Sequence, residues 1–232
     1  MPIPRRALGF TLIELLVVIA IIATLAALSM PAFRKMVSSS KASACLSNLR
    51  QIGLATMAYA NDNQLTLPPA GSGGTPEWAL LISTYSSGVK DRRSIFVCPG
   101  CEVPVQSATG NDVAVTYGMH GGLMPKGGNP LRLNSIVRPT EVILAADMCQ
   151  NPGNKGWSPY SIENPAVFTG GGRTGNNVAL DIPIATSTDS DKGNSPWIRY
   201  RHSGKAHAVM CDGHVETFEK GTILNRHAIF TK

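Results

Sequence analysis

The apolar positions of the chain begin with one long run near the N-terminus. Residues 10–30 hold a single charged side chain, Glu14. At about 1.5 Å per residue, a helix of this length spans about 30 Å, the hydrocarbon thickness of a bilayer. The run therefore predicts a transmembrane helix over residues 10–30. Arg5 and Arg6 precede it, which predicts a cytoplasmic N-terminus and a chain that continues outside the cytoplasm.

A second apolar pattern follows Pro31. Between residues 42 and 60, apolar side chains recur at steps of three and four, which is the period of an amphipathic helix. A proline inside a helix can kink it without ending it. We therefore expect one long helix, kinked at Pro31, whose amphipathic half covers residues 31–62.

The remaining residues, 63–232, alternate between short apolar runs and turn-forming residues. The apolar runs predict a short helix and three strands, at residues 78–85, 95–97, 113–117 and 142–146. Glycine, proline and polar residues dominate 148–198, which predicts an irregular excursion with one or two small elements. The expected fold class is α+β, with the long helix packed on a globular head built around an antiparallel sheet.

The last part of the head predicts a β-hairpin. Two strand-like segments, 206–211 and 214–218, flank Asp212-Gly213, which is a two-residue signal for a type I′ turn. We expect Asp212 and Gly213 to adopt the left-handed backbone of such a turn. The smaller apolar face of the hairpin, which holds Ala208, is expected to pack inward.

Composition and charge narrow the function classes. Charged residues make up 16% of the 232 residues, and the chain has 23 glycines and 16 prolines. This mix excludes a coiled-coil rod, a polar disordered tail and a multi-span membrane protein. The net charge of +6 is spread too thinly to indicate a nucleic-acid partner. A local basic group is expected to be a solvated face rather than a DNA-binding patch: Arg199, Arg201, His202, Lys205 and His207.

The N-terminal segment carries a resemblance to a known family. Gly9-Phe10-Thr11-Leu12-Ile13-Glu14, followed by an apolar helix, resembles the N-terminal motif that type IV prepilins share with type II secretion pseudopilins. The resemblance implies that residues 1–9 are a leader, and that a prepilin peptidase cuts between Gly9 and Phe10 and methylates the new α-amine of Phe10. It also implies that Glu14 guides packing with copies of this chain or with other pilins.

The physical chemistry of Glu14 agrees with that implication. A carboxylate inside a membrane helix costs about 2.5–3.5 kcal/mol, and such a group usually has a partner and a function. Cleavage after Gly9 creates a cation one helical turn from Glu14, and the two charges can neutralise each other within or between subunits. A secretory signal peptide or a plain signal anchor, the alternatives for the apolar run, would leave Glu14 unexplained.

The C-terminal segment carries a second resemblance. His202, nine residues and then Asp212-Gly213 resemble the H-X9-DG signature of a group of prepilin-like proteins. Four other segments resemble the same group: Cys45–Ala55, Phe96–Pro99, Thr116–Met119 and Pro139–Asp147. The biochemical activity of that group is undefined, so we expect a structural role for the signature. The His202 imidazole would reach a backbone carbonyl or a carboxylate such as Asp147.

The cysteines leave several states open. Five cysteines mean that at least one is unpaired, metal-bound or paired between chains. Cys98 and Cys101 have zinc-knuckle spacing, and outside the cytoplasm the alternative is a disulfide of either one with Cys45 or with each other. Candidates for the other ligands of a zinc site are Cys149, Cys211, His207 and His214. No cofactor is certain from the sequence.

Calcium is a separate candidate. The segment from Asp189 to Asn194 begins like an EF-hand loop, but its glycine comes one position early and Tyr200 stands where the last ligand should be. The segment is therefore not an EF-hand. A looser calcium site stays open.

Taken together, the residues favour a structural subunit, anchored by one helix in the inner membrane with its head outside the cytoplasm and assembled into an extracytoplasmic filament. We expect no catalysis, because no serine lies in a nucleophile elbow and the acid–base candidates are limited to His202, Asp212 and Asp147. One alternative is a binding module that recognises DNA, a surface polymer or a secreted substrate through residues 148–198. Another is a metal-dependent enzyme in the head.

The motif predicts the processing of the chain. Intact-mass measurement of the protein from its native membrane should show the loss of residues 1–9 and one added methyl group on Phe10. Cleavage in the region 27–30 instead would indicate an ordinary secreted protein.

Overall fold

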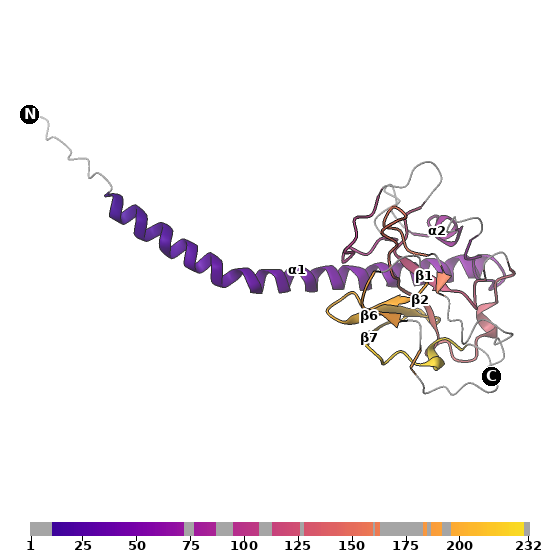
Figure 1. The fold of residues 1–232 in the computed structure, drawn as a ribbon. Coiled ribbons are helices and arrows are strands. Elements are labelled where there is room, and N and C mark those ends of the chain that lie inside the picture. The colour runs from indigo at the N-terminus through magenta and orange to yellow at the C-terminus, as the bar shows by residue number, and fades with distance from the viewer. Residues whose placement is uncertain are drawn as a thin grey trace, which may run out of the picture. The chain divides into compact units, whose positions relative to one another are not determined.

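The computed structural model describes residues 11–71, 77–86, 95–106, 113–125, 128–159, 161–162, 183–184, 187–191 and 196–229. Its longest element is helix α1, Leu12–Asp62, which continues through Pro31 without interruption (Figure 1). The predicted kink at Pro31 stays a prediction. The chain divides into two compact units, Met1–Ser40 and Lys41–Lys232, so α1 contributes its first part to one unit and its last part to the other.

The second unit is built on a five-stranded sheet. The sheet contains β1 (Tyr117–His120), β2 (Ile143–Asp147), β3 (Ser161–Ile162), β6 (Lys205–Met210) and β7 (Val215–Glu219). Their order is β3-β1-β2-β6-β7, with antiparallel pairing throughout except for the parallel pair of β3 and β1. A separate parallel pair joins β4 (Ser187–Thr188) to β5 (Ile198–Arg199). The expected α+β class is confirmed, and the sheet is mixed because β3 adds a parallel edge.

Three short helices complete the described elements: α2 (Glu77–Ile82) and the 3₁₀ turns Leu133–Ser135 and Asn225–His227. Helix α2 and strand β2 confirm two of the predicted elements. The strand expected at 113–117 begins only at Tyr117, and the one expected at 95–97 is wrong. Segment 95–97 is a turn. The backbone N–H of Thr116 donates to the carbonyl of Phe96, and a single hydrogen bond of this kind is too few for a strand ladder.

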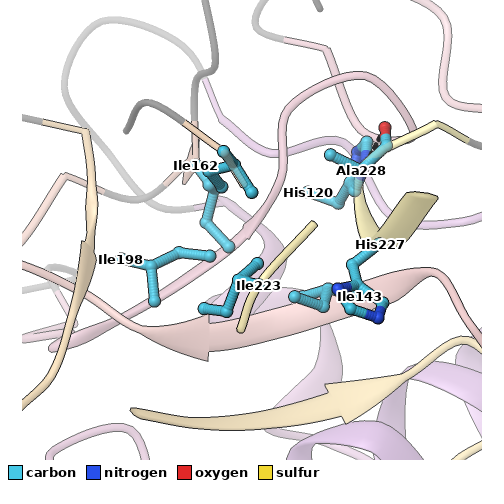
Figure 2. A pocket seen from close by; sticks show the side chains of 8 residues that line it. His120, Ile143, Ile162, Ile198, Ile223, His227 and Ala228 are labelled. Atoms are coloured by element: carbon cyan, nitrogen blue, oxygen red, sulfur yellow. Dashed lines mark hydrogen bonds between the residues drawn. The ribbon is translucent and has the colours of Figure 1, made fainter. Parts of the chain in front are cut away.

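One face of the sheet packs against small loop elements. The buried residues of this face form a single cluster: Ile143, Ala146, Met148, Ile162, Ile184, Ile198, Tyr200, Ala206, Ala208, Met210, Phe218 and Ile223. Figure 2 shows four of its isoleucines, from β2, β3, β5 and the segment after β7, directed toward one small space. The cluster anchors the described ends of the 148–198 excursion to the sheet.

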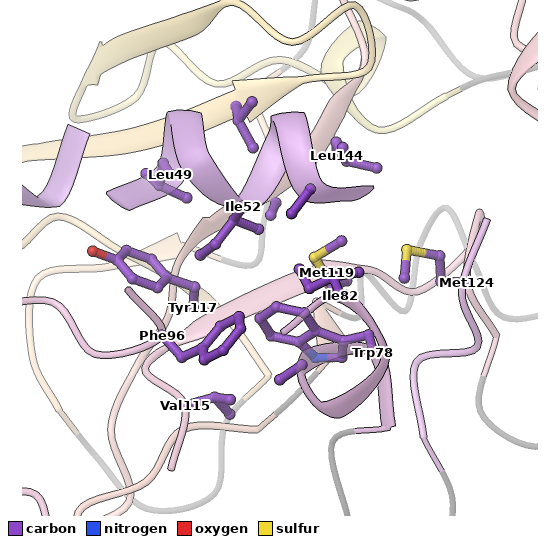
Figure 3. Packing of buried hydrophobic residues seen from close by; sticks show 14 of the residues in the cluster. Leu49, Ile52, Trp78, Ile82, Phe96, Val115, Tyr117, Met119, Met124 and Leu144 are labelled. Atoms are coloured by element: carbon purple, nitrogen blue, oxygen red, sulfur yellow. The ribbon is translucent and has the colours of Figure 1, made fainter. Parts of the chain in front are cut away.

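The opposite face of the sheet packs against the helices. Leu49 and Ile52 of α1 lie over Tyr117 and Leu144 of the sheet, with α2 beside them (Figure 3). Trp78 of α2 meets Phe96 edge to face, with ring centroids 5.5 Å apart. Strand β6 is therefore buried on both faces, which corrects the expectation that only the Ala208 side packs inward.

A glycine lets α1 approach the sheet closely. A Cβ at Gly53 would lie 2.6 Å from Cγ2 of Val209 in β6, which is closer than two carbon atoms can approach. The neighbouring strand β2 is irregular at this level, with a register shift between Ile143 and Ala145. The shift directs two consecutive residues, Leu144 and Ala145, to the helix side of the sheet.

The hairpin of β6 and β7 has a different turn from the predicted one. Met210 pairs with His214 across a three-residue loop, in which the N–H of Gly213 donates to the carbonyl of Met210. Gly213 has φ of +92°, whereas Asp212 is not among the described residues with positive φ. The loop is a three-residue hairpin connection that ends in a left-handed glycine. The pairing of β6 with β7 is therefore shifted by one residue from the predicted pairing. As a result, Phe218 pairs with Ala206 rather than lying on the Val209 side.

The contact of Gly53 with Val209 leads to a stability prediction. Alanine at 53 would gain about 1 kcal/mol of helix propensity, but overpacking against a stiff β-branched side chain costs about 1–3 kcal/mol. Gly53→Ala should therefore lower the unfolding free energy of the chain in detergent, measured by chemical denaturation. Adding Val209→Ala should recover part of that loss, whereas Ser47→Ala on the exposed side of α1 should be neutral. A more stable Gly53→Ala variant would contradict the close contact.

Candidate functional site

The N-terminal motif meets the start of helix α1. Gly9 and Phe10 lie outside the described residues, so their predicted processing is not tested by the structure. Glu14 lies in the first turn of α1, and its Oε2 accepts hydrogen bonds from the backbone N–H and the hydroxyl of Thr11, at 2.9 and 2.7 Å. The hydroxyl of Thr11 in turn lies 3.3 Å from the N–H of Glu14.

These contacts form a capping box, which satisfies N–H groups that a helix start leaves without partners. Sequence reasoning assigned Glu14 a role in assembly and missed this one. The signal was present, because threonine followed three residues later by glutamate before an apolar run is the pattern of a capping box. Glu14 therefore has a local role in the uncut chain besides any role after cleavage.

The first unit offers an apolar surface. Every residue from Thr11 to Lys41 is exposed, among them the large apolar side chains from Leu12 to Val37. Helix α1 is long and apolar enough to cross a membrane. An exposed apolar surface of this extent is the mark of a membrane or protein contact.

The second unit contains a buried cluster of chemically active side chains. Cys45 of α1 and Cys98 form a disulfide, with their Cα atoms 5.1 Å apart. Nε2 of His202 lies 3.5 Å from Sγ of Cys98 and 3.3 Å from Oδ2 of Asp147 at the end of β2. The backbone N–H of His207 in β6 donates to the same Oδ2 at 2.9 Å. All five residues are buried, so the cluster joins four separated segments of the chain inside the head.

The structure decides between the cysteine alternatives. The disulfide links Cys45 with Cys98, one of the expected pairs, and Cys101, Cys149 and Cys211 are outside it. The other two pairings that the sequence left open, Cys101 with Cys45 and Cys101 with Cys98, are not formed, because Cys98 turns toward α1 instead. Burial raises the pKa of the Cys101 thiol, which leaves it protonated at neutral pH.

Gly100 explains how the cysteine loop reaches the histidine. A Cβ at Gly100 would lie 2.7 Å from Cε1 and 3.1 Å from Nδ1 of His202. The imidazole also stacks on His207, with ring centroids 4.2 Å apart and planes within 17°. The expected contact of His202 with Asp147 is confirmed, and the contacts with Gly100 and His207 restrict the ring.

The rest of the H-X9-DG signature lies in a different place. Asp212 accepts hydrogen bonds from the backbone and the ring of His214, at 3.1 and 2.6 Å, within the hairpin turn. Gly213 supplies the left-handed residue of that turn. The signature therefore combines two structural roles, with His202 in the buried cluster and Asp212-Gly213 at the surface turn.

The cluster gives no support to an acid–base relay of His202, Asp147 and Asp212. A relay needs one ring nitrogen toward the nucleophile and the other toward the carboxylate. Here Cys98 and Asp147 both approach Nε2 of His202. Cys98 is also held in the disulfide, and Asp212 bonds to His214.

The basic group near β5 is not a surface patch. Four members of the group are buried, and only Lys205 is exposed to solvent: the buried ones are Arg199, Arg201, His202 and His207. Arg199 pairs with Glu102 at 2.9 Å, and both arginines pair with Asp191 at 3.3–3.4 Å. Both the solvated-face and the DNA-patch interpretations are therefore wrong.

The same ion pairs bear on the calcium candidate. Arg199 and Arg201 neutralise Asp191, and Lys220 pairs with Asp189. Within the described part of this segment, both carboxylates are held by cations of the chain. The loop shape itself includes residues 192–195, which lie outside the described residues.

A small apolar cavity lies on the loop side of the sheet. His120, His227 and Ala228 line it together with the isoleucines of Figure 2, and it has room for about one water molecule. It is therefore too small for an organic ligand.

His120 at this cavity is held in one neutral form. Its Nε2 lies 3.0 Å from the carbonyl of Ala228, so this nitrogen carries the proton. Its Nδ1 accepts hydrogen bonds from the backbone N–H groups of Gly122 and Leu123, at 3.1 and 3.2 Å, so this nitrogen carries no proton. Burial lowers the pKa of His120 to about 4.

The pKa of His120 predicts a pH dependence of stability. Between pH 4 and about 6.5 the unfolded chain binds a proton that the folded chain excludes, so the folded state loses stability as pH falls through this window. The melting temperature of the chain in detergent should drop by at least a few degrees, since each kcal/mol corresponds to about 2–4 °C at this size. His120→Gln, which cannot titrate, should reduce the slope. Burial also lowers the pKa values of His207 and His227 to about 4, so these two residues should maintain part of the slope in the variant. An unchanged slope in His120→Gln would contradict the assignment.

Comparison with known proteins adds one finding. Residues 4–30 match the family model of the prokaryotic N-terminal methylation motif, which covers the predicted cleavage site, Glu14 and the start of α1. No curated protein and no solved structure matches the chain. The match supports a type IV pilin-like protein with a membrane-anchored N-terminal helix.

Proposed function

We propose that this chain is a structural subunit of an extracytoplasmic filament of the type IV pilus or type II secretion kind. A prepilin peptidase removes residues 1–9 and methylates Phe10. Residues 10–30 anchor the subunit in the inner membrane before assembly, with the head outside the cytoplasm. In the filament, the same helix packs against copies of itself or against other pilins.

One observation carries the proposal. The methylation motif at residues 4–30 leads directly into a helix whose apolar residues, from Leu12 to Val37, are all exposed. The described residues of the first unit, 11–40, do not bury this surface, so on this proposal lipid or neighbouring helices cover it. In a filament subunit, lipid covers the apolar surface of α1 before assembly, and other subunits cover it afterwards.

Glu14 fits both stages. Before cleavage its carboxylate accepts two hydrogen bonds from Thr11, which lowers the cost of placing it at the start of an apolar helix. After cleavage the α-amine of Phe10 is a positive charge close to it in sequence. Pairing of that amine with Glu14 of a neighbouring subunit would set the axial position of each new subunit.

The head supports a structural role. The proposal assigns no catalysis to it, because the buried disulfide occupies Cys98 and His202 directs a single nitrogen at both of its partners. The resemblance to the H-X9-DG group extends the proposal to the head, as a compact domain displayed on the filament surface.

The role of Glu14 separates the assembly function from the capping function. Glu14→Gln keeps an oxygen that can accept from Thr11 but removes the charge, whereas Glu14→Ala removes both. If the charge drives assembly, both variants should insert into the membrane and lose filament incorporation by at least about tenfold, the factor that about 1.4 kcal/mol of ion pairing supplies. The measurement is the amount of chain in sheared filaments relative to the amount in membranes.

Ser29→Ala, an exposed change in the same helix, is the matched control and should incorporate normally. Normal incorporation of Glu14→Gln alone would assign Glu14 to capping. Normal incorporation of both variants would remove the electrostatic argument.

A further inference from the structure

The buried cluster around His202 has the composition of a metal site. Sγ of Cys45, Sγ of Cys98 and a ring nitrogen of His202 all lie within 4.8 Å of one another. The three residues are buried and come from α1, from the loop after α2 and from the segment before β6. Two thiolates and an imidazole are the ligand set that zinc prefers.

The two distances from Nε2 of His202 to its neighbours in the cluster match those between the ligands of a tetrahedral zinc site. Zinc bonds of about 2.0–2.3 Å at tetrahedral angles place neighbouring ligand atoms about 3.3–3.8 Å apart. Nε2 of His202 lies 3.5 Å from Sγ of Cys98 and 3.3 Å from Oδ2 of Asp147. In the disulfide state the two sulfur atoms are bonded to each other, so they must separate to admit the ion, and Asp147 must move closer to the more distant ligand atoms.

A second observation points to the same place. Asp147 is fully buried, yet its Oδ1 has no hydrogen-bond partner among the described residues. A buried carboxylate oxygen without a partner is costly, because nothing replaces the water it has lost. Asp147 is not within 4.8 Å of every member of the group of three, but it already faces Nε2 of His202. It is therefore the candidate for the fourth ligand.

We propose that reduction of the Cys45–Cys98 disulfide converts this cluster into a site for one Zn²⁺, bound by Cys45, Cys98, His202 and Asp147. A dithiol reductant supplies two electrons and two protons, becomes a disulfide itself and leaves two thiols in the cluster. Zinc then displaces both thiol protons and binds the two sulfurs as thiolates. The disulfide and the zinc ion are alternative links between α1 and the head.

The surroundings favour this site over the zinc knuckle suggested by the sequence. Cys101 is outside the group of three, so the Cys98–Cys101 spacing is not the basis of the site. Two thiolates and one carboxylate exceed the charge of Zn²⁺ by one negative charge. The guanidinium of Arg201, which interacts with Asp147, offsets that excess.

The experiment compares metal binding in the two redox states of the full chain in detergent. The chain is treated with excess dithiol and freed of it by gel filtration without oxygen, and alkylation of an unfolded sample then counts two more reactive cysteines than in the oxidised chain. After addition of ZnCl₂ and a second gel filtration, the reduced chain should retain about one zinc per chain and the oxidised chain almost none. Co²⁺ in place of zinc should give the absorption bands of thiolate-bound tetrahedral cobalt.

Variants test which side chains bind the ion. His202→Ala and Asp147→Asn should weaken zinc binding by at least about tenfold in the reduced state. Two control variants should retain zinc: Cys101→Ser, in the loop that holds Cys98, and His214→Ala, an exposed histidine in the hairpin of β6 and β7. Circular dichroism of each oxidised variant shows whether it is folded, and His202→Ala carries the test if Asp147→Asn is not.

Three results would overturn the proposal. The disulfide could withstand the dithiol in the folded chain. The reduced wild type could fail to retain zinc. Zinc could be lost in Cys101→Ser and retained in His202→Ala, which would assign the ion to a different set of ligands.

Discussion

The architecture depends on an apolar helical surface that its own unit does not cover. The large apolar side chains from Leu12 to Val37 are exposed, whereas one face of the same helix between Cys45 and Ala60 is buried in the head. The sequence changes character within one continuous helix, from apolar on all sides to apolar on one face. The head covers the second part, whereas the exposed first part is suited to a contact with lipid or with another protein surface. This division gives a pilin-like subunit its two environments.

The head is organised around the second part of that helix. Gly53 lets α1 approach Val209, and the disulfide of Cys45 with Cys98 fixes the helix covalently to the loop beside His202. His202 extends the connection to Asp147 at the end of β2. Packing at Gly53 and the disulfide at Cys45 thus hold the helix on the head, and the contact of His202 with Asp147 connects the disulfide loop to the sheet.

Much of this was readable from local patterns, and the failures have physical causes. Hydropathy predicted the span, and the capping pattern of Thr11 with Glu14 was present but overlooked. The Asp212-Gly213 pair suits both a two-residue turn and a longer loop ending in a left-handed glycine, so the register could not be chosen locally. Arg199 and Arg201 were expected at the surface because their partners, Glu102 and Asp191, meet them only in the folded chain.

The most direct measurement of the central claim is mass spectrometry of filaments sheared from cells that make this chain. The account predicts that the sheared fraction contains the chain from N-methylated Phe10 to its end. A strain that lacks the prepilin peptidase should retain the uncut chain in its membranes. Absence of the chain from the filament fraction of cells that export it, or its presence there with residues 1–9 attached, would contradict the account.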